Sequence, residues 1–202
     1  MQSFFDSCLL LHHKILIVLE EALFMHSNEL VSLCSAGNGE VRITHYPPLP
    51  ISALKTGNKF RIAEHTDVGV LTLLFQDSVS GLEVEDQKSL AAGKDGKFIP
   101  VESKNLGEMI VNCGDTLQMW SADLLRSANH RVTYNRDLDA DEREDVIIPS
   151  RYSVGFFGKA NPEASIDPIA GLIGKGVKKE AVEGKGKTAQ EYYNFMHEKT
   201  YS

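Results

Sequence analysis

The first pattern along the chain is helical. Between residues 3 and 26, apolar residues recur at the spacing that places them on one face of an α-helix: Phe5, Leu9, Leu16, Leu19 and Leu23. Further apolar residues are expected to widen this buried face, namely Leu10, Leu11, Ile17 and Val18. The segment is interrupted by charged and histidine residues and has no small-residue cleavage site, which argues against a signal peptide. No uninterrupted apolar stretch of the chain reaches the length of a membrane span. We therefore expect a helix that lies across a sheet.

After the polar sequence SAGNGE, the pattern changes from helix to strand. Eight short runs are rich in Val, Ile, Thr and aromatic residues and are separated by Gly, Pro, Asp and Ser: VRITHYP, GVLTLLFQ, GLEVED, FIPVES, MIVNCGD, TLQMWS, HRVTY and RYSVGFF. This number of short strands favours a β-sandwich or jelly roll with flanking helices. Two stretches, FQDSVSGLEV and EDQKSLAAGKDGKFIPV, have the pattern of β-hairpins. The expected fold class is mainly β.

Two other segments complete the predicted organisation. Residues 135–150 are strongly acidic and are expected to form a solvated loop, with weak calcium binding as a less favoured alternative. Near the C-terminus, Thr188 and Glu191 have the spacing of a capping box, which predicts a helix from about residue 188. We expect one domain, made of an N-terminal helical segment (1–40), a central β region (41–160) and a C-terminal loop and helix (161–202).

Composition limits the possible functions. The 202 residues include 42% hydrophobic and 24% charged residues, which suffices for one well-formed core. The net charge of -7, with no dense Lys/Arg block, argues against a nucleic-acid partner. The three cysteines, Cys8, Cys34 and Cys113, are widely spaced and contain no Cys-x-x-Cys pair. They favour a reducing compartment, and we expect a cytoplasmic protein without a membrane partner.

A histidine and an aspartate in FRIAEHTDVGVLTLLFQD form a candidate metal site. Residues i and i+2 of a strand point to the same side, so His65 and Asp67 can direct ligand atoms at one point. A third ligand is needed, and His130, at the start of another strand-like run, is the candidate. Two histidines and one carboxylate on one face of a metal leave open positions, as in non-haem Fe(II) oxygenases. The His-x-Asp pair alone is a weak indication, since a lone buried histidine is usually only hydrogen-bonded.

A second candidate site lies in RYSVGFF. Arg151 and Ser153 alternate onto one strand face and together offer a guanidinium group and a hydroxyl to an anion. A buried arginine without a partner is costly, so a bound carboxylate ligand is one explanation. The alternative is that Arg151 pairs with an acidic side chain of the protein itself.

Taken in order, six motifs resemble those of the Fe(II)- and 2-oxoglutarate-dependent dioxygenases of the isopenicillin N synthase-like family: ITHYPPLP, EHTDVGVLTLLFQD, GLEVED, GEMIVNCGD, SANHRV and RYSVGFF. The resemblance covers residues 41–160, and the family's N-terminal region is largely missing. It implies a double-stranded β-helix, or jelly roll. It further implies that Fe(II) is bound by His65, Asp67 and His130, and that 2-oxoglutarate is bound by Arg151, Ser153 and Tyr46. Phe157 falls where the family packs an aromatic ring against substrate.

The activity implied by this resemblance is oxidation of a small organic molecule by O2, by hydroxylation or desaturation, with release of succinate and CO2. Three alternatives remain open at this point. One is an Fe(II) oxidase of the same fold that does not use 2-oxoglutarate. Another is a catalytically silent remnant that acts as a binding or regulatory module. A zinc hydrolase is a more distant possibility, because three nitrogen and oxygen ligands also suit zinc.

Overall fold

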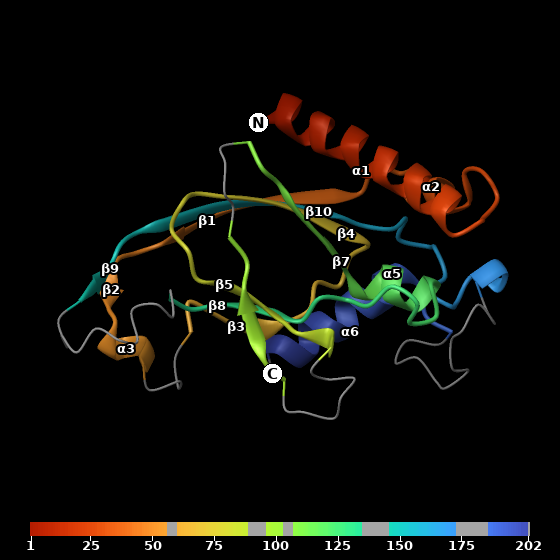
Figure 1. Cartoon of the computed structure of the whole chain (residues 1–202). Helices are drawn as coiled ribbons and strands as arrows, with labels where there is room; N and C mark the ends of the chain where they lie inside the picture. Colours follow the sequence, from red (N-terminus) through yellow and green to blue (C-terminus); the bar gives the residue numbers. More distant parts are fainter. Residues whose placement is uncertain (56–59, 89–95, 103–106, 135–145, 173–185, 202) are drawn as a thin grey trace.

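The computed structural model describes residues 1–55, 60–88, 96–102, 107–134, 146–172 and 186–201. Its centre consists of two four-stranded antiparallel sheets (Figure 1). The first sheet has the order β1-β10-β4-β7, formed by Gly39–Tyr46, Arg151–Gly158, Leu71–Gln76 and Ile110–Cys113. The second has the order β3-β8-β5-β6, formed by Ile62–His65, His130–Val132, Leu82–Glu85 and Phe98–Pro100. A short pair, β2 (Leu49–Pro50) and β9 (Ile147–Ile148), lies beside them. This is the predicted jelly roll.

The first sheet uses its two faces differently. Alternate side chains of β4 and β10, such as Leu73 and Phe156, point outward and pack with Cys8 beneath helix α1 (Gln2–Ala22). The intervening residues, such as Thr72 and Ser153, point to the inside of the barrel. Apolar residues from both sheets fill the rest of the interior, including Tyr46, Leu82, Val132, Ile62, Leu74 and Ile110. The first sheet is therefore covered on one face and lines a cavity with the other.

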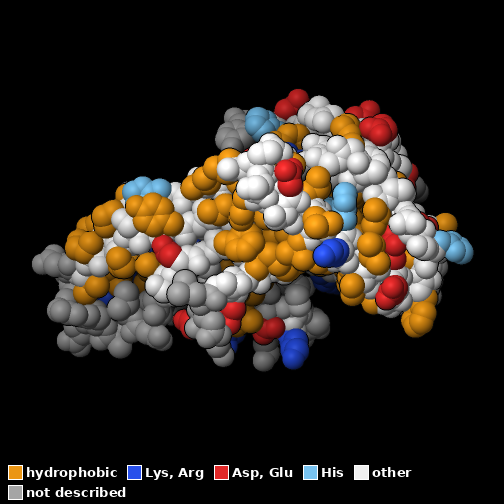
Figure 2. All heavy atoms as spheres, turned by 90° about the horizontal axis from the view of Figure 1, so that it is seen from above, with side chains coloured by type: hydrophobic (Ala, Val, Ile, Leu, Met, Phe, Trp, Pro, Cys, Tyr) orange, Lys and Arg blue, Asp and Glu red, His pale blue; other side chains and the backbone are white. Residues whose placement is uncertain are grey.

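The predicted N-terminal helix is confirmed but ends at Ala22, before the predicted residue 26, and it lies across the outer face of the first sheet as expected (Figure 1). Its buried stripe is narrower than predicted and consists of Cys8, His12, Leu16 and Glu20, with Phe5 and Leu9 packed beside it. Leu10, Ile17 and Val18 were expected to be buried but are exposed. Figure 2 shows hydrophobic side chains on this side of the molecule. A helix on a sheet buries only one stripe, so apolar residues outside it remain uncovered.

The structure corrects two local predictions. TLQMWS was expected to be a strand but lies in helix α5 (Asp115–Trp120). Its buried residues Thr116, Leu117, Met119 and Trp120 follow a helical spacing, which a short apolar run does not reveal unambiguously. FQDSVSGLEV is not a hairpin, because β4 belongs to the first sheet and β5 to the second. The second predicted hairpin is confirmed by the pairing of β5 with β6.

The remaining helices are short, apart from the last. Helices α2 (Glu29–Ser32) and α3 (Ser52–Lys55) and the 3₁₀ helix η2 (Ala170–Leu172) connect larger elements. Helix α6 (Ala189–Tyr201) begins at the predicted capping box, in which the backbone N–H of Thr188 donates to Glu191 and the N–H of Glu191 donates to Thr188. Most of the predicted acidic loop, residues 135–145, lies outside the described residues. Among the described helices, none combines the length and apolar character needed to cross a membrane.

Candidate active site

Two histidines meet between neighbouring strands of the second sheet. His65, the last residue of β3, is the direct cross-strand partner of His130, the first residue of β8. Their ring centroids are 4.3 Å apart. Each Nδ1 lies within hydrogen-bonding distance of a backbone oxygen two residues earlier, at 2.9 Å for His65 and 2.8 Å for His130. If Nδ1 carries the proton, each Nε2 has a free lone pair with which it can bind a metal.

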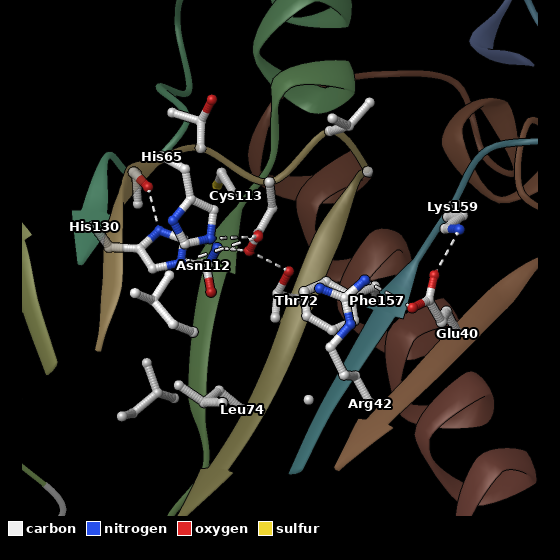
Figure 3. Close-up of a pocket in the computed structure, with 18 of the residues that line it drawn as sticks. Glu40, Arg42, His65, Thr72, Leu74, Asn112, Cys113, His130, Phe157 and Lys159 are labelled. Carbon is white, nitrogen blue, oxygen red and sulfur yellow. Dashed lines mark hydrogen bonds and ion pairs between the residues drawn. The ribbon is translucent and has the colours of Figure 1, made fainter. Parts of the chain in front are cut away.

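Asp67 provides the carboxylate that completes this group. Its Oδ1 lies 3.8 Å from Nε2 of His65 and 4.0 Å from Nε2 of His130. Figure 3 shows the two imidazoles close to each other. The three ligand atoms all lie within 4.8 Å of one another, so they are placed to share one ion. One detail differs from the sequence reasoning: β3 ends at His65, and Asp67 lies in the connection to β4 rather than on the same strand. The predicted convergence of the three side chains is nevertheless confirmed.

The other oxygen of Asp67 is held by the opposite sheet. Thr72 of β4 donates to Oδ2 at 2.7 Å, and Asn112 of β7 donates to the same oxygen at 2.9 Å. Both hydrogen bonds leave Oδ1 facing the histidines. The candidate metal-ligand group is therefore assembled from both sheets: two imidazoles come from one, and the carboxylate is oriented by the other. Such outer hydrogen bonds fix the direction of a metal ligand.

The loop that carries Asp67 is packed tightly against the start of α5. The backbone N–H of Asp115 donates to the carbonyl of Asp67 at 2.7 Å, and Thr66 donates to the Asp115 carboxylate. Gly114 makes this approach possible, because a Cβ there would lie 2.7 Å from the Asp67 carbonyl oxygen and closer still to that of Gly69. Burial raises the pKa of Asp115, although hydrogen bonds from Ser127, Thr66 and Tyr192 oppose this rise.

The electrostatic environment favours neutral imidazole at His65. Burial lowers the pKa of His65, and the neighbouring His130 lowers it further. The backbone carbonyl of Ala63 and the Asp67 carboxylate act in the opposite direction, while the more distant Arg42 guanidinium adds to the lowering. A neutral imidazole is the form that binds a metal. The donor set, two neutral nitrogens and one carboxylate oxygen, fits a divalent iron site with open positions.

A large cavity opens from these three residues. Its volume is about 1010 Å³, and it is lined by both sheets and by one face of α6. The apolar part of its wall includes Leu74, Leu82, Val84, Ile110 and Val132, and the α6 part includes Ala189, Gln190, Tyr193, Met196 and His197. A volume at the upper end of the usual range for small-molecule sites leaves room for more than one bound molecule.

Arg151 lies in this cavity and is almost completely buried, with 1% of its surface exposed. Its Nη2 donates to Oε1 of Gln76 at 2.6 Å, whereas its buried Nε and Nη1 have no hydrogen-bond partner among the residues that the structure describes. Within the described residues, no carboxylate forms an ion pair with Arg151. The alternative in which Arg151 pairs with an internal acidic side chain therefore finds no support in this part of the chain. Two buried guanidinium nitrogens, which carry three N–H groups between them, remain available to an anion.

The other predicted site residues line the same cavity. Tyr46 is the cross-strand partner of Arg151, and the guanidinium carbon of Arg151 lies 4.8 Å from the centre of the Tyr46 ring. Ser153 is buried on the same face of β10 as Arg151. Phe157 lies further along that face, where its ring covers Gly155. All seven residues predicted from the sequence, His65, Asp67, His130, Arg151, Ser153, Tyr46 and Phe157, thus border one cavity.

Comparison with protein families identifies the group to which this architecture belongs. Residues 37–159 match the family model described as the 2OG-Fe(II) oxygenase superfamily. The chain belongs to this superfamily. Its matched region includes all of the first sheet, all of the second, and the seven predicted residues.

Individual relatives of this 2OG-Fe(II) oxygenase chain agree with the family match. A 2-oxoglutarate-dependent dioxygenase, frbA, from Dothideomycetidae sp. is 41% identical over 202 residues, which cover 100% of this chain and 57% of the relative. A proline hydroxylase, buaE, from Petromyces alliaceus is 40% identical over 173 residues, covering 86% of this chain and 51% of the relative. The chain therefore spans only about half the length of these curated relatives.

A solved structure shows the same fold. A full-length Neurospora crassa protein, crystallised in complex with alpha-KG, superposes with a TM-score of 0.80 at 30% identity, covering 100% of this chain and 56% of that one. The likeness extends over both sheets and the flanking helices of this superfamily member, because every residue of the chain is covered.

Two residues that orient Asp67, Thr72 and Asn112, were not predicted from the sequence. Each is a polar residue inside an otherwise apolar strand, in LTLL and in IVNC. A polar side chain at an interior strand position requires a partner, and this signal could have drawn attention to them. The partner itself, Asp67, is not predictable from the sequence alone because it lies on a different element.

Proposed function

We propose that this chain carries the catalytic site of an Fe(II)- and 2-oxoglutarate-dependent dioxygenase that hydroxylates or desaturates a small organic molecule. His65, Asp67 and His130 would bind the iron. Arg151, Ser153 and Tyr46 would bind 2-oxoglutarate, and Phe157 would contact the substrate. When bound, iron supplies the activation of O2, which is coupled to oxidative decarboxylation of 2-oxoglutarate to succinate and CO2 and to oxidation of the substrate.

The observation that carries this proposal is the unpaired Arg151 guanidinium in the same cavity as the His65–Asp67–His130 group. A buried cation with two unpartnered nitrogens is costly unless an anion occupies the site. A carboxylate accepts two parallel hydrogen bonds from a guanidinium, so the distal carboxylate of 2-oxoglutarate matches the available donors. The Ser153 hydroxyl on the same strand face supplies a further donor. The alpha-KG, or 2-oxoglutarate, in the complex of the similar Neurospora crassa protein supports this role for Arg151.

The protein's own residues would then have three tasks. The two Nδ1 hydrogen bonds to the Ala63 and Ala128 carbonyls hold the imidazoles in the ligating tautomer. Thr72 and Asn112 hold Asp67 with one oxygen toward the metal. The apolar wall, with Leu74 and Val132, excludes water from the reacting molecules.

Two finer assignments belong to the same proposal. The order of the motifs supports an isopenicillin N synthase-like member of the superfamily. The three cysteines are all free, and two of them are buried, which supports a reducing, cytoplasmic location.

An anaerobic titration with Fe(II) and then 2-oxoglutarate tests the proposal. We expect the weak visible charge-transfer band of an iron-bound 2-oxoglutarate to develop with saturation, and to be absent from the Asp67→Ala variant. Iron binding without this band would contradict the proposed use of 2-oxoglutarate and would favour an oxidase of the same fold. Band formation without succinate release in air, with or without candidate substrates, would instead favour a silent binding module.

A further inference from the structure

A group of charged residues lies in the cavity away from the residues assigned to iron and 2-oxoglutarate. Glu40 and Arg42 are on β1 and Lys159 follows β10 (Figure 3). Arg42 donates to Oε1 of Glu40 at 2.9 Å, and Lys159 donates to Oε2 of the same carboxylate at 3.1 Å. Both oxygens of Glu40 are thus engaged by cations. Two positive charges and one negative charge leave one net positive charge on this part of the cavity wall.

Arg42 is the cation that remains open to a ligand. The Lys159 ammonium is placed between Glu40 and the ring of Tyr193, whose centre is 4.4 Å away, and its side chain is 23% exposed. The Arg42 side chain is 62% exposed, and within the described residues its only hydrogen bond is the one to Glu40. A guanidinium has five N–H donors, so most of those of Arg42 are available.

The position of Arg42 is defined by packing as well as by charge. Its guanidinium carbon lies 5.2 Å from the centre of the Phe157 ring, within the range of a cation–π contact. The Phe157 ring in turn covers Gly155, the cross-strand partner of Arg42. A Cβ at residue 155 would lie 3.0 Å from the ring, so the glycine provides the space that the ring occupies. The ring and the guanidinium together form one prearranged surface.

This surface is separate from the 2-oxoglutarate site. Arg151 pairs with Tyr46 in the β1–β10 register, whereas Gly155 pairs with Arg42 four residues further along. At about 3.3 Å per residue, the two arginines are roughly 13 Å apart along the strands. Glu64 of β3 also borders the cavity, but within the described residues it forms no ion pair with Arg42 or Lys159, whose carboxylate partner is Glu40.

We propose that Arg42, supported by Lys159 and Phe157, binds the carboxylate of the substrate, so that the enzyme acts on an organic acid with an apolar or aromatic body. This inference rests on the proposed function, since it assigns the remaining part of the same cavity. A single excess positive charge matches a carboxylate better than a phosphate dianion. The apolar body would lie against Phe157, Met196 and Leu74, between the carboxylate and the metal.

Binding of matched probe molecules tests the inference. The protein is loaded with Zn(II) in place of iron and with 2-oxoglutarate, and phenylacetate, phenylacetamide and phenyl phosphate are titrated by ligand-observed NMR. Phenylacetate should bind about two- to fivefold more tightly than its neutral amide, the range expected for an exposed ion pair. Arg42→Gln should abolish this preference. Lys159→Gln should reduce it, because the excess positive charge disappears.

Arg126 provides the matched control, because it is an exposed arginine outside the cavity. Arg126→Gln should keep the preference for phenylacetate. The dissociation constant for 2-oxoglutarate should be unchanged in Arg42→Gln, and a loss of 2-oxoglutarate binding there would overturn the assignment of Arg42 to substrate. Tighter binding of phenyl phosphate than of phenylacetate would overturn the carboxylate class.

The same experiment separates this inference from the proposed function. If the wild-type protein binds neither metal nor 2-oxoglutarate, the proposed function itself is wrong. If both bind but phenylacetate and phenylacetamide bind equally, only the role of Arg42 is wrong. Melting temperatures of the Arg42 and Lys159 variants within about 2 °C of the wild type would show that lost binding is not lost folding.

Discussion

Thr72 of the first sheet donates a 2.7 Å hydrogen bond to Asp67, whose other oxygen faces the two histidines of the second sheet. Thr72→Val removes this donor while keeping the shape of the side chain. The Asp67 carboxylate then loses one of its two side-chain hydrogen bonds, so metal affinity should fall by between about tenfold and a hundredfold. Competition with a chelator of known affinity measures the change.

Thr133→Val is the control for this substitution, because Thr133 is equally buried but makes no contact with the carboxylate that the structure records. It should lower stability to a similar extent and leave metal affinity unaltered. Asn112→Leu removes the second donor and should repeat the effect of Thr72→Val. Unchanged metal affinity in both Thr72→Val and Asn112→Leu would show that these hydrogen bonds do not orient a ligand.

Asp67→Ala should abolish metal binding and iron-dependent turnover while the protein stays folded. The carboxylate is the only anionic member of the predicted ligand set, and its removal leaves two imidazoles. The fold is less affected, because the backbone carbonyl of Asp67 still accepts from Asp115. Metal content after dialysis and far-UV circular dichroism check the two parts separately. A variant with full metal content and activity would exclude Asp67 as a ligand.

Arg151→Lys should weaken 2-oxoglutarate binding by about 2–3 kcal/mol, on the order of a hundredfold, with metal affinity nearly unchanged. Lysine keeps the charge but cannot reproduce the paired N–H geometry of a guanidinium. Arg151→Ala should be worse. Anaerobic titration of each iron-loaded variant with 2-oxoglutarate measures the effect.

Arg131 offers a matched comparison, because its Nε donates to the buried carboxylate of Glu83 at 2.7 Å. Arg131→Lys disturbs an internal ion pair and should lower the melting temperature without a selective effect on 2-oxoglutarate. If Arg151→Lys behaves like Arg131→Lys, with lower stability and normal co-substrate affinity, then Arg151 has a structural role only.

The features that were predictable from the sequence are those encoded over a few neighbouring residues. His65, Asp67 and Arg151 were predicted as site residues because of the spacing of two pairs. His65 lies two positions from Asp67, and Arg151 lies two positions from Ser153. The prediction of a strand at TLQMWS was wrong because a short apolar run fits helix and strand alike. The prediction of a hairpin at FQDSVSGLEV was wrong because a turn signal does not determine which sheet the next strand joins.

The residues that could not be predicted act between distant elements. Thr72 and Asn112 reach Asp67 only because the two sheets face each other, and Arg42 meets Phe157 only through the pairing of β1 with β10. Such contacts depend on the register of whole strands, in which a shift of one residue would turn every side chain to the other face. The candidate ligands, including His130 on its separate run, could thus be predicted from short motifs, whereas their orientation could not.

His12 should make the stability of the apoprotein depend on pH. It lies on α1 and is buried against Phe156 and Gly158 of β10, and within the described part of the chain neither ring nitrogen has a hydrogen-bond partner. Burial, with a smaller contribution from His13, lowers the pKa of His12 from 6.5 to about 4. The unfolded chain therefore binds a proton more readily than the folded protein between these values, and stability must fall as the pH falls from about 6.5 toward 4. A pKa difference of this size corresponds to about 3 kcal/mol in the free energy of unfolding.

Urea denaturation of the metal-free protein at pH 7, 6 and 5 measures this dependence, and His12→Leu isolates it. Leucine has no titrating group and leaves no unpaired nitrogen in the buried stripe of α1, so the variant should lose less stability than the wild type as the solution is acidified. His26→Leu is the control, because His26 is exposed. In this variant the unfolding free energy should change with pH as steeply as in the wild type. Carboxylates titrate in all three proteins, so the informative quantity is the difference between their slopes. Parallel slopes for wild type and His12→Leu would mean that His12 is protonated equally in the folded and unfolded states, and that its contact with β10 opens without cost.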